Sequence, residues 1–136
     1  IFEQDHGWEI AVMGSSLGGF LATKVAQQYG VKVLLINPAV TPDVLLNLYQ
    51  GEQTHPYLLQ QYNIDQNYIQ QLISLNVEVI NEPDKIWVLL QKEDEVLDYR
   101  DVLKKYNACK ISCENGGDHS FIGFERYLAE IIHFLY

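Results

Sequence analysis

The fold of this chain is decided by the stretch Glu9-Ile10-Ala11-Val12-Met13-Gly14-Ser15-Ser16-Leu17-Gly18-Gly19. Its apolar first half is typical of a short buried strand, and the residues after it have the apolar spacing of a helix that ends near Gly30. Between strand and helix stands Gly-x-Ser-x-Gly, the pattern of a sharp turn that exposes a serine hydroxyl above the sheet edge. We therefore expect Ser16 to be a nucleophile, with Gly14 and Gly18 leaving room for the strand and the helix to approach each other.

Other glycine-rich turns fit this stretch less well. A phosphate-binding P-loop requires Gly-Lys-Ser/Thr, but Gly19 is followed by Phe20 and Leu21. A dinucleotide-binding fingerprint requires glycine at position 16, where this chain has Ser16. The remaining alternative is a strand–helix turn in which Ser16 only caps the helix.

A serine nucleophile on such a turn needs an acid and then a histidine further along the chain. The run Lys85 to Leu90 predicts a second buried strand, and an acidic stretch follows it. A carboxylate just past the carboxyl end of a strand has the right position for the acid, and we assign this role to Asp94. Glu93, Glu95 and Asp98 remain alternatives, since an acidic stretch is often only a solvated loop.

The candidate base is His119, in the loop Asn115 to Phe121 after a last predicted strand. Two glycines make this loop flexible enough to bring a histidine across the top of the sheet. The other histidines fit less well: His6 precedes the nucleophile, His55 precedes the acid strand, and His133 falls inside a terminal helix predicted from Phe124 to Leu135. The chain order Ser16, Asp94, His119 is that of a hydrolase built on an α/β sheet.

Taken together, these motifs resemble the YqiA-type esterases, which are small bacterial α/β-hydrolases. The resemblance covers nearly the whole chain. It rests on Val12-Met13-Gly14-Ser15-Ser16-Leu17-Gly18-Gly19, Asn37-Pro38-Ala39-Val40, Asp94-Glu95-Val96-Leu97-Asp98-Tyr99-Arg100, Gly116-Gly117-Asp118-His119-Ser120-Phe121 and Gly123-Phe124-Glu125. It implies a Ser–Asp–His hydrolase that acts on small-molecule acyl esters or thioesters, with Ser16, Asp94 and His119 at the matching positions.

One departure from that family concerns the oxyanion hole. The family opens with a strand that runs into a His-Gly-Phe loop, and this loop supplies half of the hole; residues 1–136 contain no such segment. We expect the backbone N–H of Leu17 to supply the other half, because it follows the nucleophile and opens the helix. We therefore interpret residues 1–136 as a single α/β-hydrolase domain that lacks its N-terminal strands. An uncovered sheet edge would favour a homo-oligomer.

Composition limits the partners that the chain can have. The 136 residues carry a net charge of −9, which argues against binding nucleic acid and against docking on anionic membranes. No apolar run approaches the length of a membrane-spanning helix. Cys109 and Cys113 are too far apart along a strand for a disulfide and too few for a metal site, so we expect buried thiols in a cytoplasmic protein with no cofactor.

The segment order predicts an α/β fold, a mostly parallel sheet flanked by helices. The predicted strands are Glu9–Met13, Val31–Ile36, Lys85–Leu90 and Lys110–Glu114. Pro42 to Leu48 and Asp65 to Leu75 are predicted helices, joined by a Tyr/Gln-rich loop from Tyr49 to Asn63. Residues 47–71 form either a polar surface segment or a substrate cap. Two functions fit this organisation: a serine esterase or thioesterase, and an incomplete or degenerate hydrolase domain that binds a ligand or partner without turnover.

Overall fold

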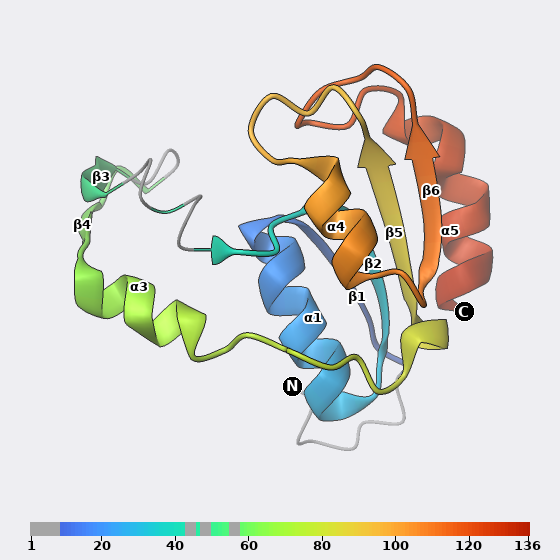
Figure 1. The fold of residues 1–136 in the computed structure, drawn as a ribbon, viewed down its shortest axis with the longest axis horizontal. Helices are drawn as coiled ribbons and strands as arrows, with labels where there is room; N and C mark the ends of the chain where they lie inside the picture. Colours follow the sequence, from blue (N-terminus) through green and yellow to red (C-terminus); the bar gives the residue numbers. More distant parts are fainter. Residues whose placement is uncertain (1–8, 43–45, 47–49, 55–57) are drawn as a thin grey trace.

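The computed structural model describes residues 9–42, 46, 50–54 and 58–136. A four-stranded parallel sheet lies at its centre, with strand order β1-β2-β5-β6 (Figure 1). These strands are β1 (Ala11–Ser16), β2 (Lys32–Pro38), β5 (Ile86–Gln91) and β6 (Lys110–Glu114). The expected α/β fold class is confirmed. The β6 bounds agree with the sequence prediction, whereas β1 begins later than predicted and runs on to the serine itself.

Helices cover both faces of this sheet. They are α1 (Leu17–Tyr29), α4 (Tyr99–Lys105) and α5 (Leu128–Leu135). On one face, α1 and α4 pack on alternate residues of the two central strands, such as Val33, Leu35 and Val88. On the other face, α5 packs on the intervening residues, such as Leu34 and Trp87. Because both faces are covered, the central strands are apolar along most of their length, from Val33 to Ile36 and from Ile86 to Leu90.

Helix α1 ends where the sequence predicted. Gly30 adopts a left-handed conformation (φ 63°), and its N–H donates to the carbonyl of Ala26 at 2.8 Å. A residue with a Cβ is strained in this conformation, so glycine is the favoured cap. The terminal helix differs from its prediction, because Phe124–Tyr127 forms a 3-10 helix, η2, and only Leu128–Leu135 is α-helical.

The segment after β2 contains more strand than its sequence suggested. The predicted loop from Tyr49 to Asn63 includes an antiparallel hairpin, β3 (Gly51–Thr54) and β4 (Gln61–Ile64), set to the side of the main sheet (Figure 1). Helix α3 (Gln66–Ile73) follows, shorter than predicted, and the Asp65 carboxylate accepts its capping N–H from Tyr68. Pro42 and Leu46 are helical, and the rest of the helix predicted up to Leu48 lies largely outside the described residues.

The two cysteines are not both buried as expected. Cys109 precedes β6 and is partly buried, and this burial raises the pKa of its thiol to about 11. Cys113 is exposed on β6, which lies at the edge of the sheet. Both thiols are free. Among the helices in the described part of the chain, none is long and apolar enough to cross a membrane.

Candidate active site

Ser16 occupies the turn between β1 and α1 in a strained backbone conformation. Its φ of 53° and ψ of −122° lie where residues with a Cβ are rarely found, at a cost of about 1–3 kcal/mol. The pairing of β1 with β2 shifts register at this point, so that Ser16 stands opposite Pro38. The Ser16 side chain makes no capping hydrogen bond to α1. Ser16 therefore stands at the N-cap position without a side-chain cap.

Gly14 and Gly19 allow the close packing around this turn, whereas the sequence predicted Gly14 and Gly18. A Cβ on Gly14 would overlap the backbone of Gly18 and the side chain of Ala22, and a Cβ on Gly19 would overlap Pro38. A Cβ on Gly18 would meet nothing within 4 Å, because it is the Gly18 carbonyl group that faces Gly14. The expectation was therefore right for Gly14 and wrong for Gly18.

This difference predicts opposite effects of two alanine substitutions. We expect Gly14→Ala to destabilise the protein by about 1–3 kcal/mol, since the methyl group has to displace packed backbone. Gly18→Ala is expected to be neutral or to stabilise the helix by up to about 1 kcal/mol. Urea unfolding of the two variants measures both changes, and equal losses of stability would contradict this account of the turn.

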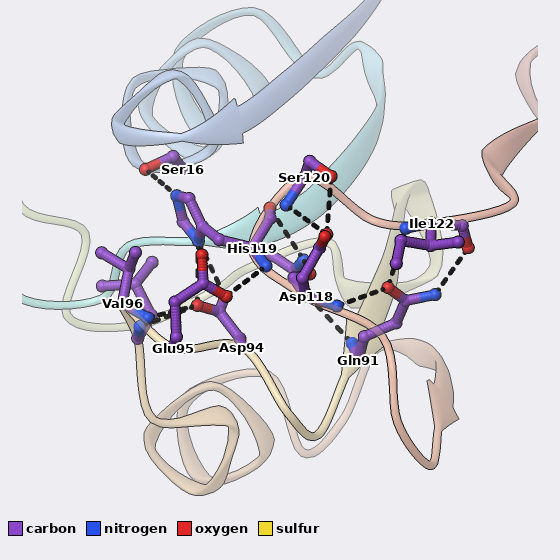
Figure 2. A network of polar contacts seen from close by, with 11 residues as sticks. Ser16, Gln91, Asp94, Glu95, Val96, Asp118, His119, Ser120 and Ile122 are labelled. Carbon is purple, nitrogen blue, oxygen red and sulfur yellow. Dashed lines mark hydrogen bonds and ion pairs between the residues drawn. The ribbon is translucent and has the colours of Figure 1, made fainter.

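The structure brings the three predicted site residues together in one chain of polar contacts (Figure 2). His119 Nε2 lies 3.0 Å from Ser16 Oγ. On the other side of the ring, His119 Nδ1 lies 3.0 and 2.8 Å from the two carboxylate oxygens of Asp94. The Asp94 side chain is 3% exposed and that of His119 22% exposed, so the carboxylate is shielded from water while the ring reaches the surface.

Asp94 is held in place by the backbone that follows it. Its Oδ1 accepts the N–H groups of Val96 at 2.8 Å and Leu97 at 2.9 Å. These bonds are those of a tight turn, in which an aspartate side chain folds back on the next residues. The carboxylate is therefore fixed as an acceptor, with its second oxygen at 2.8 Å from His119 Nδ1.

The alternative acids do not contact the ring of His119. Asp98 caps α4 through the N–H of Arg100 and pairs with the Arg100 guanidinium, which holds the pKa of Asp98 at about 2. Glu95 accepts the backbone N–H of His119 at 3.0 Å and does not contact the ring nitrogens. Glu93 is exposed to solvent. Of the four carboxylates considered from the sequence, Asp94 is the one whose oxygens reach the His119 ring.

The loop that carries His119 (residues 115–122, the His loop) begins at a charged cluster around Glu114. Glu114 accepts hydrogen bonds from the Arg126 guanidinium at 2.9 Å, from Gln91 Nε2 at 2.9 Å and from the Tyr127 hydroxyl at 2.8 Å. Arg126 first, then Gln91 and Tyr127, hold the pKa of Glu114 at about 2, below its ordinary value of 4.5. The ionised carboxylate joins the end of β6 to η2.

The low pKa predicts a loss of stability in acid. Because the folded-state pKa lies below the ordinary value of 4.5, ionised Glu114 stabilises the fold above about pH 4.5, and this contribution disappears as the pH falls toward 2. We expect Glu114→Gln to lower the Tm near neutral pH, with the difference from wild type shrinking below pH 4.5. The exposed Glu78 offers a control in Glu78→Gln. A difference in Tm that stays constant from pH 7 to pH 3 would contradict the assignment.

The sequence analysis assigned no role to two polar residues that contact the His loop. Asn37 and Gln91 are the buried amides at the carboxyl ends of β2 and β5, and both bond to the His loop. A polar residue that ends an otherwise apolar strand was the available signal. No group of three His, Cys, Asp or Glu side chains in the described ranges is arranged to hold a metal ion.

The chain matches the model of one protein family along its whole length. The model of a family described as "Uncharacterised protein family (UPF0227)" matches residues 1–136. The chain belongs to this family. The matched residues include Ser16, Asp94 and the His loop.

Three solved structures illustrate the fold that this chain shares with other proteins. The esterase domain of a Rhodothermus marinus protein is 16% identical, with a TM-score of 0.63 over 90% of this chain and 58% of that one. Mouse alpha/beta hydrolase domain-containing protein 10 is 16% identical, with a TM-score of 0.62 over 93% of this chain and 62% of that one. Est1E from Butyrivibrio proteoclasticus, solved with ferulic acid bound, is 19% identical, with a TM-score of 0.59 over 92% and 57%. The chain thus has the α/β-hydrolase fold and spans about three fifths of the length of these structures.

Proposed function

We propose that this chain carries the catalytic residues of a serine hydrolase that cleaves small to medium acyl esters or thioesters. The observation that carries the proposal is the unbroken contact chain from Ser16 Oγ through the His119 ring to the buried Asp94 carboxylate. The strained turn at Ser16 supports it, because strain of this kind is typical of a nucleophile held for reaction. The resemblance to YqiA-type esterases points the same way.

The proposed reaction proceeds in two halves. Ser16 Oγ attacks the acyl carbonyl carbon while its proton moves to His119 Nε2, and the same proton then leaves with the alcohol or thiol. The acyl group remains as an ester on Ser16. Water then gives a proton to His119 Nε2 and attacks this ester, which releases the acid and restores the Ser16 hydroxyl. Asp94 accepts the Nδ1–H of His119, which keeps the Nε2 atom free to take the serine proton.

The Leu17 backbone N–H is the proposed donor to the oxyanion that forms during each attack. Leu17 is the first residue of α1, so its N–H also lies at the positive end of the helix dipole. A crystal structure of a phosphonate adduct should place the phosphonyl oxygen about 3 Å from the Leu17 nitrogen. An adduct oxygen that points away from this nitrogen would rule out the assignment.

Apolar residues surround the nucleophile. Leu17 packs with the apolar cluster of Leu46, Ile64, Ile69 and Leu72, in which Ile64 ends β4 and the last two residues belong to α3. Leu17 also packs with Phe20 and Ala39 on the sheet side, where Val96 and Leu97 join the same cluster. Apolar side chains on both sides of the nucleophile suit the apolar acyl chain of an ester.

Hydrolysis of p-nitrophenyl esters tests this function. We expect turnover of the acetate and butyrate esters by the native protein and a lower kcat/KM for longer chains. The matched control is Ser16→Ala, which removes one oxygen atom from a residue that makes no capping bond. Ester binding without turnover in the native protein would instead favour a degenerate hydrolase domain.

A further inference from the structure

The His loop has no regular structure that would fix the histidine by itself. Its backbone turns through left-handed conformations at Gly116 (φ 75°), Gly117 (φ 82°) and Phe121 (φ 66°). A loop of this kind has many accessible conformations, so some other part of the fold has to select the one in which His119 reaches Ser16. Two buried side-chain amides, Asn37 and Gln91, make contacts that select this conformation, and Figure 2 shows the contacts of Gln91.

Asn37 is the first of these amides. It lies near the end of β2 with its side chain 1% exposed and its backbone at a φ of 39°. Its Oδ1 accepts the backbone N–H of Gln91 at 3.0 Å, and its Nδ2 donates to the carbonyl oxygens of Asp118 at 3.0 Å and of His119 itself at 3.1 Å. One side chain thus joins the ends of β2 and β5 to the peptide groups on both sides of the His119 Cα atom.

Gln91 is the second amide, at the last position of β5 and 2% exposed. Its Oε1 accepts the N–H groups of Asp118 at 3.1 Å and Ile122 at 2.9 Å, and its Nε2 donates to the Ile122 carbonyl at 2.7 Å. A Cβ at Gly117 would overlap the Gln91 side chain, so the loop and this amide fit closely. Gln91 therefore holds the His loop just before and just after His119.

Each amide uses donor and acceptor atoms at once, which an ionised carboxylate cannot do because it has acceptor atoms only. An aspartate at position 37 would keep the size of the side chain but set a carboxylate oxygen against the carbonyl oxygens of Asp118 and His119. Burial makes such a mismatch costly, since the unpaired groups cannot turn to water. The loop would have to move, and a displacement of about 1 Å at a catalytic group can cost about 10²-fold in rate.

From these contacts we infer that Asn37 and Gln91 are positioning residues that set the distance from His119 Nε2 to Ser16 Oγ. They act through His119 and do not touch the substrate. The inference rests on the proposed function in one respect, namely that proton transfer between Ser16 and His119 limits turnover. It extends the site from three side chains to five, with both additions at the ends of central strands.

The test compares Asn37→Asp and Gln91→Glu with Tyr106→Phe. Tyr106 forms a buried hydrogen bond with Thr23 outside the His loop, so its variant loses a buried polar contact of similar kind. Active sites are counted by complete reaction with a fluorophosphonate, and kcat is expressed per reacted site. We expect each amide variant to lose on the order of 10²-fold in kcat per site with little change in KM. Tyr106→Phe should lower the Tm and leave kcat per site unchanged.

A double-mutant cycle separates positioning from general damage. In a His119→Ala background, Asn37→Asp should cause no further loss of the residual rate, because the group that it positions is gone. A full additional loss in that background would overturn the inference, and so would unchanged kcat per site in both amide variants. If one amide variant does not fold, the other decides by the same two criteria.

A spectroscopic measurement tests the positioning role independently of the proposed function. The proton between His119 Nδ1 and Asp94 should give a low-field ¹H NMR signal in the native protein, and this signal should shift or broaden in Asn37→Asp and not in Tyr106→Phe. An unchanged signal would contradict the positioning role whether or not the protein turns over esters. Ester hydrolysis that persists in Ser16→Ala would contradict the proposed function and leave the NMR result to decide on Asn37.

Discussion

Asp94→Asn is expected to lower kcat by about 10⁴-fold, the size of the loss that the same change causes in serine proteases. The Asp94 carboxylate accepts from His119 Nδ1, whereas an amide can present its NH₂ group there and favour the wrong tautomer of the ring. Since the carboxylate also accepts the N–H groups of Val96 and Leu97, the amide oxygen should keep the turn in place. Circular dichroism should therefore show a folded variant with a catalytic defect.

Asp98→Asn is the matched control for this prediction. It makes the same chemical change four residues later, on a carboxylate that caps α4 and pairs with Arg100 at the surface. We expect kcat close to that of the wild type. If Asp98→Asn lost most of the activity while Asp94→Asn kept it, the assignment of the acid would be wrong.

Ser16→Ala is expected to have the largest effect, a loss on the order of 10⁶-fold in kcat, as when the nucleophile of a serine protease is removed. His119→Ala should cost about as much, because the serine hydroxyl is a poor nucleophile without its base. The losses should not add, since the residues act as one unit. Steady-state hydrolysis of p-nitrophenyl butyrate by both single variants and the double variant measures this.

A double variant far less active than either single variant would mean that Ser16 and His119 contribute independently, against the proposed mechanism. The serine at position 15 provides the control, because Ser15 precedes the strained residue and its exposed side chain is not part of the contact chain to His119. Ser15→Ala should retain activity. Loss of activity in Ser15→Ala with retention in Ser16→Ala would move the nucleophile by one position.

The sheet and the grouping of Ser16, Asp94 and His119 could be predicted because each depends on a local pattern. Buried parallel strands are continuous apolar runs, and a residue that follows such a strand lies at the carboxyl edge of the sheet wherever the strand is placed. Chain order then selected His119 over the histidines at positions 6, 55 and 133. His6 and His55 lie outside the described residues, and His133 is exposed on α5.

Other features depend on contacts that no local pattern encodes. The strand Gly51–Thr54 has little apolar alternation, and it is a strand because it pairs with Gln61–Ile64. Close packing requires a glycine at position 19 and not at position 18, because the rotation of α1 turns Gly19 toward Pro38. Asn37 bonds to residues more than 80 positions away. Contacts of this kind become visible only when the strand ends and the His loop are placed in space.

The central claim is that Ser16 is the nucleophile activated by His119, and covalent labelling tests it most directly. The native protein is treated with a fluorophosphonate, and the adduct is located by intact mass and peptide mapping. We predict one adduct per chain, on Ser16, absent in Ser16→Ala and formed far more slowly in His119→Ala. An adduct on another residue, or labelling of Ser16→Ala at the native rate, would contradict the account.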